Sequence, residues 1–345
     1  MKLTECLSYD DVLLVPQYSD IQSRSEINIG VNLDGHHVFS LPIVASPMDT
    51  VTEAAMAIKM GKLGGMAILH RYNTIEEQVE LVRNVRAELP ADLPVAAAVG
   101  VTGDYLERAI AIVDNGASIL CLDIAHGHHS LMKDALFTLK TNLSDDVHIM
   151  AGNVATREAF EDLVVWGADS VRVGIGGGSI CSTRIQTGHG VSTLQSIIDC
   201  SKASHSSGVA IIADGGIKNS GDMVKALAAG AHMVMVGSLL AGTTETPGEI
   251  IKNKDGREYK VYRGMASKEA QMKWRGKTSS LEGISAFVAS KGPLAQVVNE
   301  LETGIRSGFS YSGARCLNEL HANVKFIKQT NASISESSTH ILKSN

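Results

Sequence analysis

The sequence predicts an α/β protein that folds as a (β/α)₈ TIM barrel, and three observations support this. Eight short runs rich in Val, Ile, Leu, Met and Ala recur along the chain, and most lack polar alternation, as in parallel strands buried on both faces. Segments with helical periodicity separate these runs. The competing fold, an open doubly wound sheet, usually carries a GxGxxG motif in its first βα unit, and that motif is absent.

The expected elements alternate along the chain. Glycines at 64, 167 and 230 fall where helices should end, and Thr156 falls where one should begin. We expect strands at 41–45, 65–69, 95–100, 119–124, 148–154, 170–174, 209–214 and 232–237. We expect helices at 51–62, 75–88, 103–115, 129–141, 156–166, 192–206 and 220–229.

Two segments interrupt this alternation. Residues 176–191 (GGGSICSTRIQTGHGV) form a polar, glycine-rich loop after the sixth strand, and residues 241–295 form a longer excursion after the eighth. In a barrel both would emerge at the C-terminal face, where active sites lie. We therefore expect one catalytic barrel over residues 1–328. The Ser/Thr/Asn-rich residues 329–345 are expected to form a flexible tail.

Composition excludes several classes of protein. The 345 residues carry 31 basic and 37 acidic side chains, which argues against a nucleic-acid or anionic-membrane surface. The apolar runs are too short to span a bilayer, and the acidic N-terminal segment does not read as a signal peptide. The five cysteines form no CxxC pair, so we expect a reduced, cytoplasmic protein without a disulfide framework.

Cys181 is the first candidate for chemistry. It follows three glycines, lies among hydroxyl side chains and precedes Arg184, a setting in which a thiolate can be stabilised. On the residues alone, a nucleophile and an ordinary loop cysteine remain equally open. His189, the nearest histidine in sequence, is a weak candidate for a base. Cys121, inside an apolar strand, reads as a small buried side chain.

Glycine-rich turns follow the seventh and eighth expected strands. Asp214-Gly215-Gly216 and Gly237-Ser238 stand where barrels commonly bind phosphate through backbone N–H groups, although two ordinary turns are the alternative. Ser179 could add a hydroxyl from the cysteine loop. Asp214 would repel phosphate but suits the hydroxyls of a ribose, so the pattern suggests a nucleotide.

Further polar residues end the first and fourth strands. Asp123, His126 and His128 could suggest a metal, but the two histidines do not share a helix face, so a contact to substrate or dinucleotide is favoured. Ser46 and Met48 lie at the same rim. Met48 is either core filling or an apolar contact for a base.

Together these segments resemble the IMP dehydrogenase/GMP reductase family over about residues 5–320. The resemblance rests on LSYDDVLLVP at 7–16, SPMDTVTE at 46–53, AGNVAT at 151–156, GIGGGSICSTR at 174–184, ADGGIKNSGD at 213–222, MVMVGSLLAG at 233–242 and YRGMAS at 262–267. It implies a TIM barrel, usually a homotetramer, that binds a purine nucleoside monophosphate and a nicotinamide cofactor.

The resemblance also implies roles for individual residues. Cys181 matches the nucleophile that attacks purine C2, and Thr183 and Glu282 match its catalytic partners. Substrate contacts are implied for Ser46, Met48, Ser179, Asp214, Gly216, Gly237, Ser238, Tyr262, Gly264 and Met265. Asp123 and Gly127 match cofactor contacts. The carbonyls of Gly176, Gly178 and Cys181 match a monovalent-cation (K⁺) loop.

Two departures bear on which branch of the family this is. The regulatory repeats that dehydrogenases usually carry after the second strand are missing, because residues 75–88 run directly into 93–101. The flap between Gly264 and Glu282 contains Arg275 but no following tyrosine, so the water-activating Arg–Tyr pair of dehydrogenases is absent from it. SPMDTVTE, GISAFVASKG and Gly177, where many reductases have Pro, point the other way.

These points favour GMP reductase, which converts GMP and NADPH to IMP and ammonia. IMP dehydrogenase, acting on IMP and NAD, is the alternative, and a non-catalytic nucleotide-binding protein is a third hypothesis. The stretch 306–311 also resembles a cofactor-adjacent segment, which a neighbouring subunit could supply.

Overall fold

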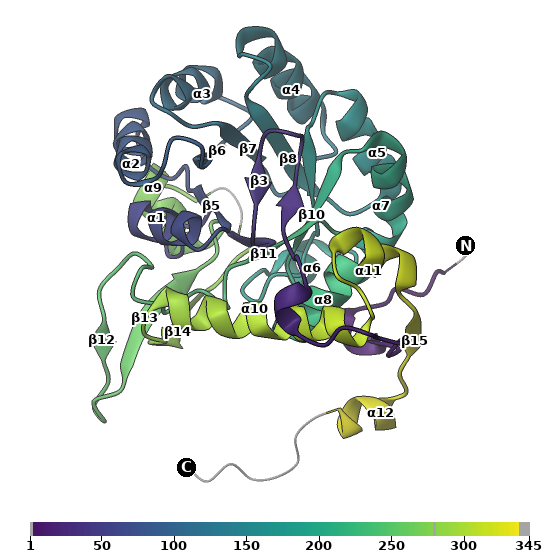
Figure 1. Cartoon of the computed structure of the whole chain (residues 1–345). Coiled ribbons are helices and arrows are strands. Elements are labelled where there is room, and N and C mark those ends of the chain that lie inside the picture. The colour runs from purple at the N-terminus through teal and green to yellow at the C-terminus, as the bar shows by residue number, and fades with distance from the viewer. Residues whose placement is uncertain (1–2, 279–280, 338–345) are drawn as a thin grey trace.

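A closed barrel of eight parallel strands forms the centre of the computed structural model, which describes residues 3–278 and 281–337 (Figure 1). Each strand pairs with the next one along the chain, and the last pairs with the first. The strands are β4 (Ile43–Ala45), β5 (Met66–Leu69), β6 (Ala96–Val99), β7 (Ile119–Asp123), β8 (His148–Val154), β9 (Ser170–Val173), β10 (Ala210–Asp214) and β11 (Met233–Val236). All eight expected strands, and with them the TIM barrel, are confirmed.

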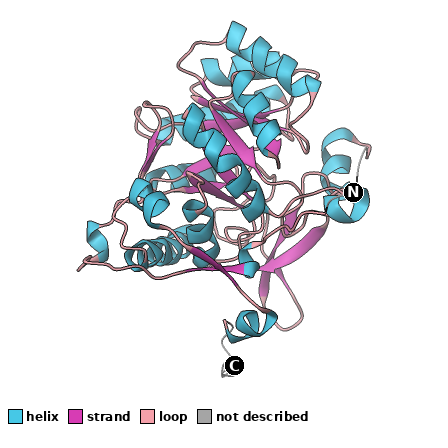
Figure 2. Cartoon of the chain, turned by 90° about the vertical axis from the view of Figure 1, so that its right-hand side faces the viewer, coloured by secondary structure: helices cyan, strands magenta, loops and turns pink. Residues whose placement is uncertain are grey.

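Helices surround the barrel, as the two views at right angles show (Figures 1 and 2). They are α1 (Ala54–Lys62), α2 (Ile75–Glu88), α3 (Tyr105–Asp114), α4 (Ser130–Asn142), α5 (Arg157–Val165), α7 (Thr193–Ser207), α8 (Ser220–Ala228) and α10 (Leu294–Tyr311). The first seven were expected. The sequence analysis missed α10, which packs against α8 and contributes the buried Leu294, Ile305 and Phe309.

The expected helix boundaries hold where they can be checked. Thr156 caps α5 by accepting a hydrogen bond from the backbone N–H of Ala159. Gly64, Gly167 and Gly230 follow α1, α5 and α8 with φ angles of 85°, 102° and 117°. Glycine adopts such left-handed backbone conformations without the steric strain that a Cβ would add, so it is the residue that ends these helices.

The two segments that interrupt the alternation of strands and helices contain helices and strands in addition to those of the barrel. The loop after β9 holds a short helix, α6 (Thr183–Thr187). The excursion after β11 is a three-stranded antiparallel sheet of β12 (Ile251–Lys252), β13 (Glu258–Arg263) and β14 (Ser285–Ala289), with α9 (Lys268–Arg275) between the last two strands. The sheet projects from the side of the barrel (Figure 1).

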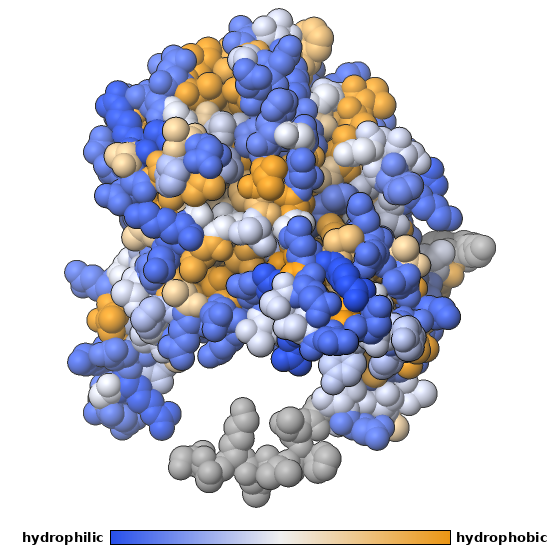
Figure 3. Space-filling model, in the orientation of Figure 1, coloured by the Kyte–Doolittle hydropathy of each residue, from blue (hydrophilic) through white to orange (hydrophobic). Residues whose placement is uncertain are grey.

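The N-terminal segment contacts both ends of the barrel, since Tyr9 lines the cavity at the C-terminal ends of the strands. A hairpin of β2 (Val31–Asn32) and β3 (Val38–Phe39) crosses the N-terminal end of the barrel, after the 3₁₀ helices η1 (Tyr9–Asp11) and η2 (Arg24–Glu26) (Figure 1). β1 (Val12–Leu14) pairs with β15 (Phe326–Lys328), which follows α11 (Leu317–Asn323). In the space-filling view, polar side chains cover most of this face, with apolar patches between them (Figure 3).

The expected tail begins as α12 (Asn331–Glu336), and residues 338–345 lie outside the described residues. Its flexibility therefore stays a prediction. Within the described part of the chain, no helix is both long and apolar enough to cross a membrane.

Candidate active site

The C-terminal ends of the barrel strands open into a cavity of about 720 Å³. Its walls come from the ends of β4, β7, β10 and β11, the loop after β9 and the flap after β13. Of the residues predicted for catalysis, substrate, cofactor or cation, the following line it: Ser46, Met48, Asp123, Gly176, Gly178, Ser179, Cys181, Thr183, Asp214, Gly216, Gly237, Ser238, Tyr262, Gly264, Met265 and Glu282.

The three predicted catalytic residues form a hydrogen-bonded chain. The Cys181 Sγ lies 3.2 Å from the Thr183 Oγ1, and that hydroxyl donates to the Glu282 Oε2 at 2.8 Å. All three residues are half-buried. A sulfur, a hydroxyl and a carboxylate in line can pass a proton between the cavity and Glu282, which is the geometry that general acid–base catalysis requires.

Backbone contacts hold the cysteine loop against the flap. The N–H of Ser182 donates to the carbonyl of Glu282 at 2.9 Å, and the N–H of Ile284 donates to the carbonyl of Ile180 at 3.1 Å. Gly264 lies so close to Gly283 that an added Cβ would come within 3.3 Å of its Cα. Because these contacts are made by the backbone, they place Glu282 beside Thr183 although 99 positions separate the two in sequence.

The predicted phosphate region is a tightly packed cluster of hydroxyls and glycines. The Ser179 hydroxyl lies 3.4 Å from the hydroxyl of Tyr262. At Gly237, a Cβ would come within 2.8 Å of the Tyr262 hydroxyl and 2.9 Å of the Ser46 Oγ, so a side chain would fill the space that these groups surround. Burial raises the pKa of Tyr262, so its phenol stays neutral and can donate a hydrogen bond.

A buried charge network lies beneath this cavity. Arg172, from β9, donates to the Asp123 Oδ1 at 2.7 Å and to the Asp214 Oδ2 at 2.9 Å. Asn153 adds a second hydrogen bond to the same Asp214 oxygen at 2.7 Å. The network fixes the orientation of both carboxylates where their strands end.

The electrostatics keep the network ionised. Burial alone would raise the pKa of Asp123, but the guanidinium groups of Arg172 and Arg71 outweigh it and lower that pKa. Burial alone would lower the pKa of Arg172, but the negative groups beside it, including Asp214, outweigh it and raise that pKa well above its usual value. Both partners therefore stay charged at neutral pH.

Several buried polar atoms around the cavity have no hydrogen-bond partner among the described residues. They are the hydroxyl of Tyr9, the Nε atoms of Arg71 and Arg172, and the Oδ1 of Asn153. All four residues line the cavity. Because buried polar groups are nearly always satisfied, water or a polar ligand in the cavity can bond these atoms.

The sequence analysis missed these four residues as site residues. Tyr9 and Asn153 lie in motifs that it quoted without assigning them roles. A stronger signal was available for Arg172, since a charge in the middle of the apolar run 170–173 needs a buried partner. Arg71 follows a buried strand and offered no comparable signal.

A second cavity, of about 740 Å³, adjoins the first and shares Arg71, Ile124 and Arg275 with it. Its other walls include Thr102, Arg108, His126, His129 and Trp274. Trp274 of the flap helix stacks on the ring of Tyr72, with ring centroids 6.1 Å apart. The flap thus covers the passage between the two cavities.

Gly127 lines neither cavity. Its N–H donates to the carbonyl of Asn153 at 2.7 Å, and an added Cβ would come within 3.0 Å of that oxygen. It therefore packs behind the loop that bears His126. The stretch 306–311 also lines neither cavity, because it lies in α10 on the outside of the barrel.

Arg184 and Asp123 line the first cavity, whereas His128 and His189 line neither cavity. Arg184 donates to the carbonyl of Val191, and His189 is exposed with its ring against the carbonyl of Thr187. The His128 ring bonds Asp162 at 2.7 Å, while Asp123 bonds Arg172, so these residues do not converge as metal ligands. Burial raises the pKa of the Cys121 thiol to about 11, which suits a packing role.

The predicted cation loop is a tight turn in which the N–H of Cys181 donates to the carbonyl of Gly178 at 3.1 Å. Gly176 adopts a φ of 79°, and an added Cβ there would come within 2.7 Å of the Arg184 side chain. The three residues share one loop, and their role toward a cation stays a prediction.

Comparison with known proteins identifies the relatives of this chain. The family model described as IMP dehydrogenase / GMP reductase domain matches residues 6–340. An inosine-5′-monophosphate dehydrogenase of Nitrosopumilus maritimus is 34% identical, with 99% of each chain covered. A GMP reductase of Leishmania major is 33% identical, with 98% of this chain and 97% of the relative covered. A crystal structure of a GMP reductase variant from Trypanosoma brucei, in complex with guanosine 5′-monophosphate, superimposes with a TM-score of 0.92 at 31% identity, covering 99% of each chain.

These comparisons bear on the missing insertion. The alignments with the dehydrogenase and with the Leishmania major reductase extend over 475 and 479 positions, well beyond the 345 residues of this chain. Relatives with either name thus carry segments that this chain lacks. The absence of the inserted segment does not separate the two activities.

Proposed function

The chain belongs to the IMP dehydrogenase/GMP reductase family, oxidoreductases that act on GMP or IMP with a nicotinamide nucleotide, and we propose that this member is a GMP reductase. In this proposal it catalyses the NADPH-dependent reductive deamination of GMP to IMP and ammonia. The solved reductase that binds guanosine 5′-monophosphate, with the same fold over nearly the whole chain, supports the choice of substrate.

The observation that carries the proposal is the hydrogen-bonded chain Cys181–Thr183–Glu282. Deamination requires a nucleophile at purine C2 and a proton for the departing amine, and this chain provides both within 3.2 Å contacts. A hydrolytic outcome would instead require a group that activates water. The flap supplies no tyrosine between Arg275 and Glu282 for that role.

In the proposed reaction, the Cys181 sulfur forms a bond to C2 and the bond between C2 and its amino nitrogen then breaks. As the sulfur adds, the thiol proton passes through the hydroxyl of Thr183 to Glu282, and the same route returns it to the amine, which leaves as ammonia. NADPH, when bound, would supply the hydride for the new C2–H bond and be oxidised to NADP⁺, and the bond between C2 and the Cys181 sulfur would break to release IMP and the thiolate. The surrounding loop and flap orient the ring and exclude water during these steps.

The rest of the cavity suits a nucleoside monophosphate. The Asp214 Oδ2 is held by Arg172 and Asn153, whereas its Oδ1 has no partner in the described part of the chain and can accept from a ribose hydroxyl. We assign the phosphate to the glycine turns with Ser179 and Tyr262. The buried hydroxyl of Tyr9, packed beside Gly216, then has a ligand oxygen to bond.

We assign the nicotinamide cofactor to the second cavity and to its junction with the first. The Arg71 guanidinium, whose Nε lies 3.6 Å from the Asp123 Oδ2, and the stacked Tyr72–Trp274 pair offer a cation and flat apolar surfaces, which fit a dinucleotide. Asp123 and Gly127, predicted as cofactor contacts, lie at or behind this junction. Arg71 and Arg275 are the cations that we propose favour the extra phosphate of NADPH over NADH.

One observation favours the dehydrogenase alternative. The guanidinium of Arg275 lies 5.9 Å from the centroid of the Tyr72 ring, so the fold supplies a tyrosine to this arginine that the flap sequence does not. The arginine faces the ring rather than the hydroxyl. This geometry suits cation–π packing better than activation of water, and we therefore retain the reductase.

The deciding experiment supplies the purified protein with GMP and NADPH and follows NADPH oxidation together with ammonia release. The proposal requires both in equal amounts. Production of NADH from IMP and NAD, without GMP-dependent oxidation, would establish the dehydrogenase instead. GMP binding without either reaction would establish a non-catalytic nucleotide-binding protein.

We extend the proposal to the assembly and setting of the enzyme. We propose a cytoplasmic homotetramer with a K⁺ ion at the carbonyls of Gly176, Gly178 and Cys181. Light scattering in solution tests the tetramer. Replacing K⁺ with Li⁺ tests the ion, because the smaller cation should lower kcat if those carbonyls hold a monovalent cation.

A further inference from the structure

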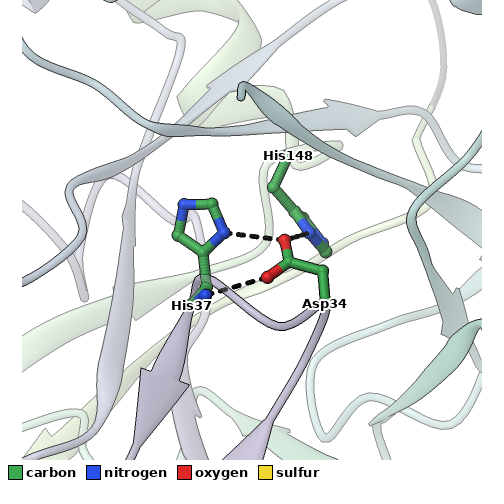
Figure 4. Close-up of side chains that lie close together, drawn as sticks. All are labelled: Asp34, His37 and His148. Atoms are coloured by element: carbon green, nitrogen blue, oxygen red, sulfur yellow. Dashed lines mark hydrogen bonds and ion pairs between the residues drawn. The ribbon is translucent and has the colours of Figure 1, made fainter. Parts of the chain in front are cut away.

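Asp34, His37 and His148 converge at the N-terminal end of the barrel, opposite the active site (Figure 4). The first two lie in the turn between β2 and β3, and His148 is the first residue of β8. Since β8 has seven residues and a strand rises about 3.3 Å per residue, roughly 20 Å separates this cluster from the rim that holds the catalytic cavity. The cluster therefore takes no part in the proposed reaction.

The three side chains present ligand atoms to one point. The Asp34 Oδ2 lies 2.7 Å from the His37 Nδ1 and 2.6 Å from the His148 Nδ1. The two imidazole rings meet nearly edge to face, with an interplanar angle of 69°, so their Nδ1 atoms approach the carboxylate from different directions (Figure 4). All the ligand atoms lie within 4.8 Å of one another.

The surroundings hold these groups in place. The second oxygen of Asp34, Oδ1, accepts the backbone N–H groups of His36 and His37 at 2.9 and 2.8 Å, which leaves Oδ2 for the histidines. The His148 Nε2 bonds the buried hydroxyl of Ser170 at 2.8 Å. If that nitrogen carries the proton, Nδ1 presents its lone pair to the cluster. Such an outer hydrogen bond is the usual support of a metal-binding histidine.

Burial and charge distinguish this cluster from an ordinary surface contact. His148 is 2% exposed and His37 is 7% exposed, whereas the Asp34 side chain remains 22% exposed and gives a path from solvent. Two imidazoles and one carboxylate are the donors that borderline divalent metals such as Zn²⁺ and Co²⁺ prefer. No cationic Lys or Arg pairs with Asp34 in the described part of the chain.

We propose that Asp34, His37 and His148 form a binding site for a divalent transition metal, with Zn²⁺ as the best fit. The ion replaces the two N–H···O hydrogen bonds, and each imidazole carries its remaining proton on Nε2. Ligand atoms about 2.0–2.2 Å from a tetrahedral zinc lie roughly 3.4 Å from one another, so the contacts now at 2.6 and 2.7 Å must lengthen to admit the ion. The ion joins the β2–β3 hairpin to β8 and closes the base of the barrel.

The test titrates Zn²⁺ into the full-length, chelator-treated protein and measures stoichiometry by calorimetry and the midpoint of thermal unfolding. We expect one tight site per chain and a higher midpoint with the ion. H37N and D34N should lose this site. H36N is the matched control, because His36 lies in the same turn but offers no side-chain ligand to the cluster, and it should bind as the unmodified protein does.

Cobalt distinguishes this site from the cysteines without any substitution. Co²⁺ bound by nitrogen and oxygen gives weak visible bands, whereas thiolate ligands add intense sulfur-to-metal charge transfer in the near ultraviolet. We expect the first equivalent to show no thiolate band. The proposal is overturned if H37N and D34N retain the tight site, if no tight site exists, or if the first equivalent shows thiolate ligation.

Discussion

Two groups of polar residues meet at the active-site cavity, and they are built in opposite ways. The charge network of Asp123, Arg172 and Asp214 comes from the barrel itself, because each residue lies on a strand, at or near its C-terminal end. The proposed catalytic chain from Cys181 to Glu282 comes from two segments outside the barrel strands, joined by backbone hydrogen bonds.

Because one group lies on the barrel strands and the other on loops, we expect the first to control stability and the second to control turnover. Arg172 is buried, and removing it takes the shared cation away from two half-buried carboxylates, so the network should govern stability. The Cys181 chain is half-buried and its hydrogen bonds are few, so its loss should leave the fold intact and remove turnover. The predictions below test this division of roles.

The largest effect is expected from C181A. Without the sulfur no covalent bond to the purine can form, so turnover should fall roughly 10⁴-fold or more while GMP binding and the unfolding midpoint stay near those of the unmodified enzyme. Steady-state kinetics and calorimetric titration with GMP measure the two quantities. C316A, at another half-buried cysteine, is the control. Substantial turnover by C181A would refute the nucleophile.

E282Q should lower kcat by about 10²-fold or more, because the amide cannot relay the proton that Thr183 passes to the leaving amine. The KM for GMP should change much less. E269Q replaces an exposed carboxylate on the same flap, bonded to Ser285, and should leave kcat almost unchanged. If both variants lose activity equally, the flap as a whole matters rather than Glu282.

R172M tests whether the charge network of Asp123, Arg172 and Asp214 governs stability. Removing the guanidinium leaves the half-buried carboxylates of Asp123 and Asp214 without their shared partner, which should cost about 3 kcal/mol of the free energy of unfolding. Urea denaturation measures this. R157M breaks an exposed helix pair with Glu161 and should cost only about 0.5 kcal/mol. Equal losses in the two variants would show that the buried network does not govern stability.

The network should also weaken in acid. The folded-state pKa of Asp123 lies below its ordinary value of 3.8, so the folded state binds fewer protons than the unfolded chain in this range. Its contribution is complete above about pH 4 and is lost as the pH falls toward the folded-state pKa. Comparing unfolding free energies of the unmodified protein and D123N across pH 2–6 should show a shallower decline in the variant.

Y9F should have only a small effect on stability. The Tyr9 hydroxyl is buried without a hydrogen-bond partner among the described residues, so its removal should change the free energy of unfolding by less than about 1 kcal/mol. If that hydroxyl bonds the nucleotide, the KM for GMP should rise severalfold. Unchanged KM together with marked destabilisation would reverse the roles that we assign to this residue.

The sequence by itself determined the barrel and much of the cavity. Strands buried on both faces are almost wholly apolar. Such strands can therefore be recognised from the sequence alone, as the run around Ile211 was. Residues that follow such strands in a barrel must meet at one rim, which is why Asp214 and Gly237 were found. The resemblance to the family added Thr183 and Glu282, which no local pattern marks.

Only the tertiary structure decided which distant side chains meet. Arg172 bridges two carboxylates because β7, β9 and β10 curve around one closed barrel, and Tyr72 meets Arg275 because the flap folds back over the rim. His37 and His148 share Asp34 across more than a hundred positions. Periodicity records whether a side chain is buried, but a contact depends on the path of the whole chain, which a local pattern does not contain.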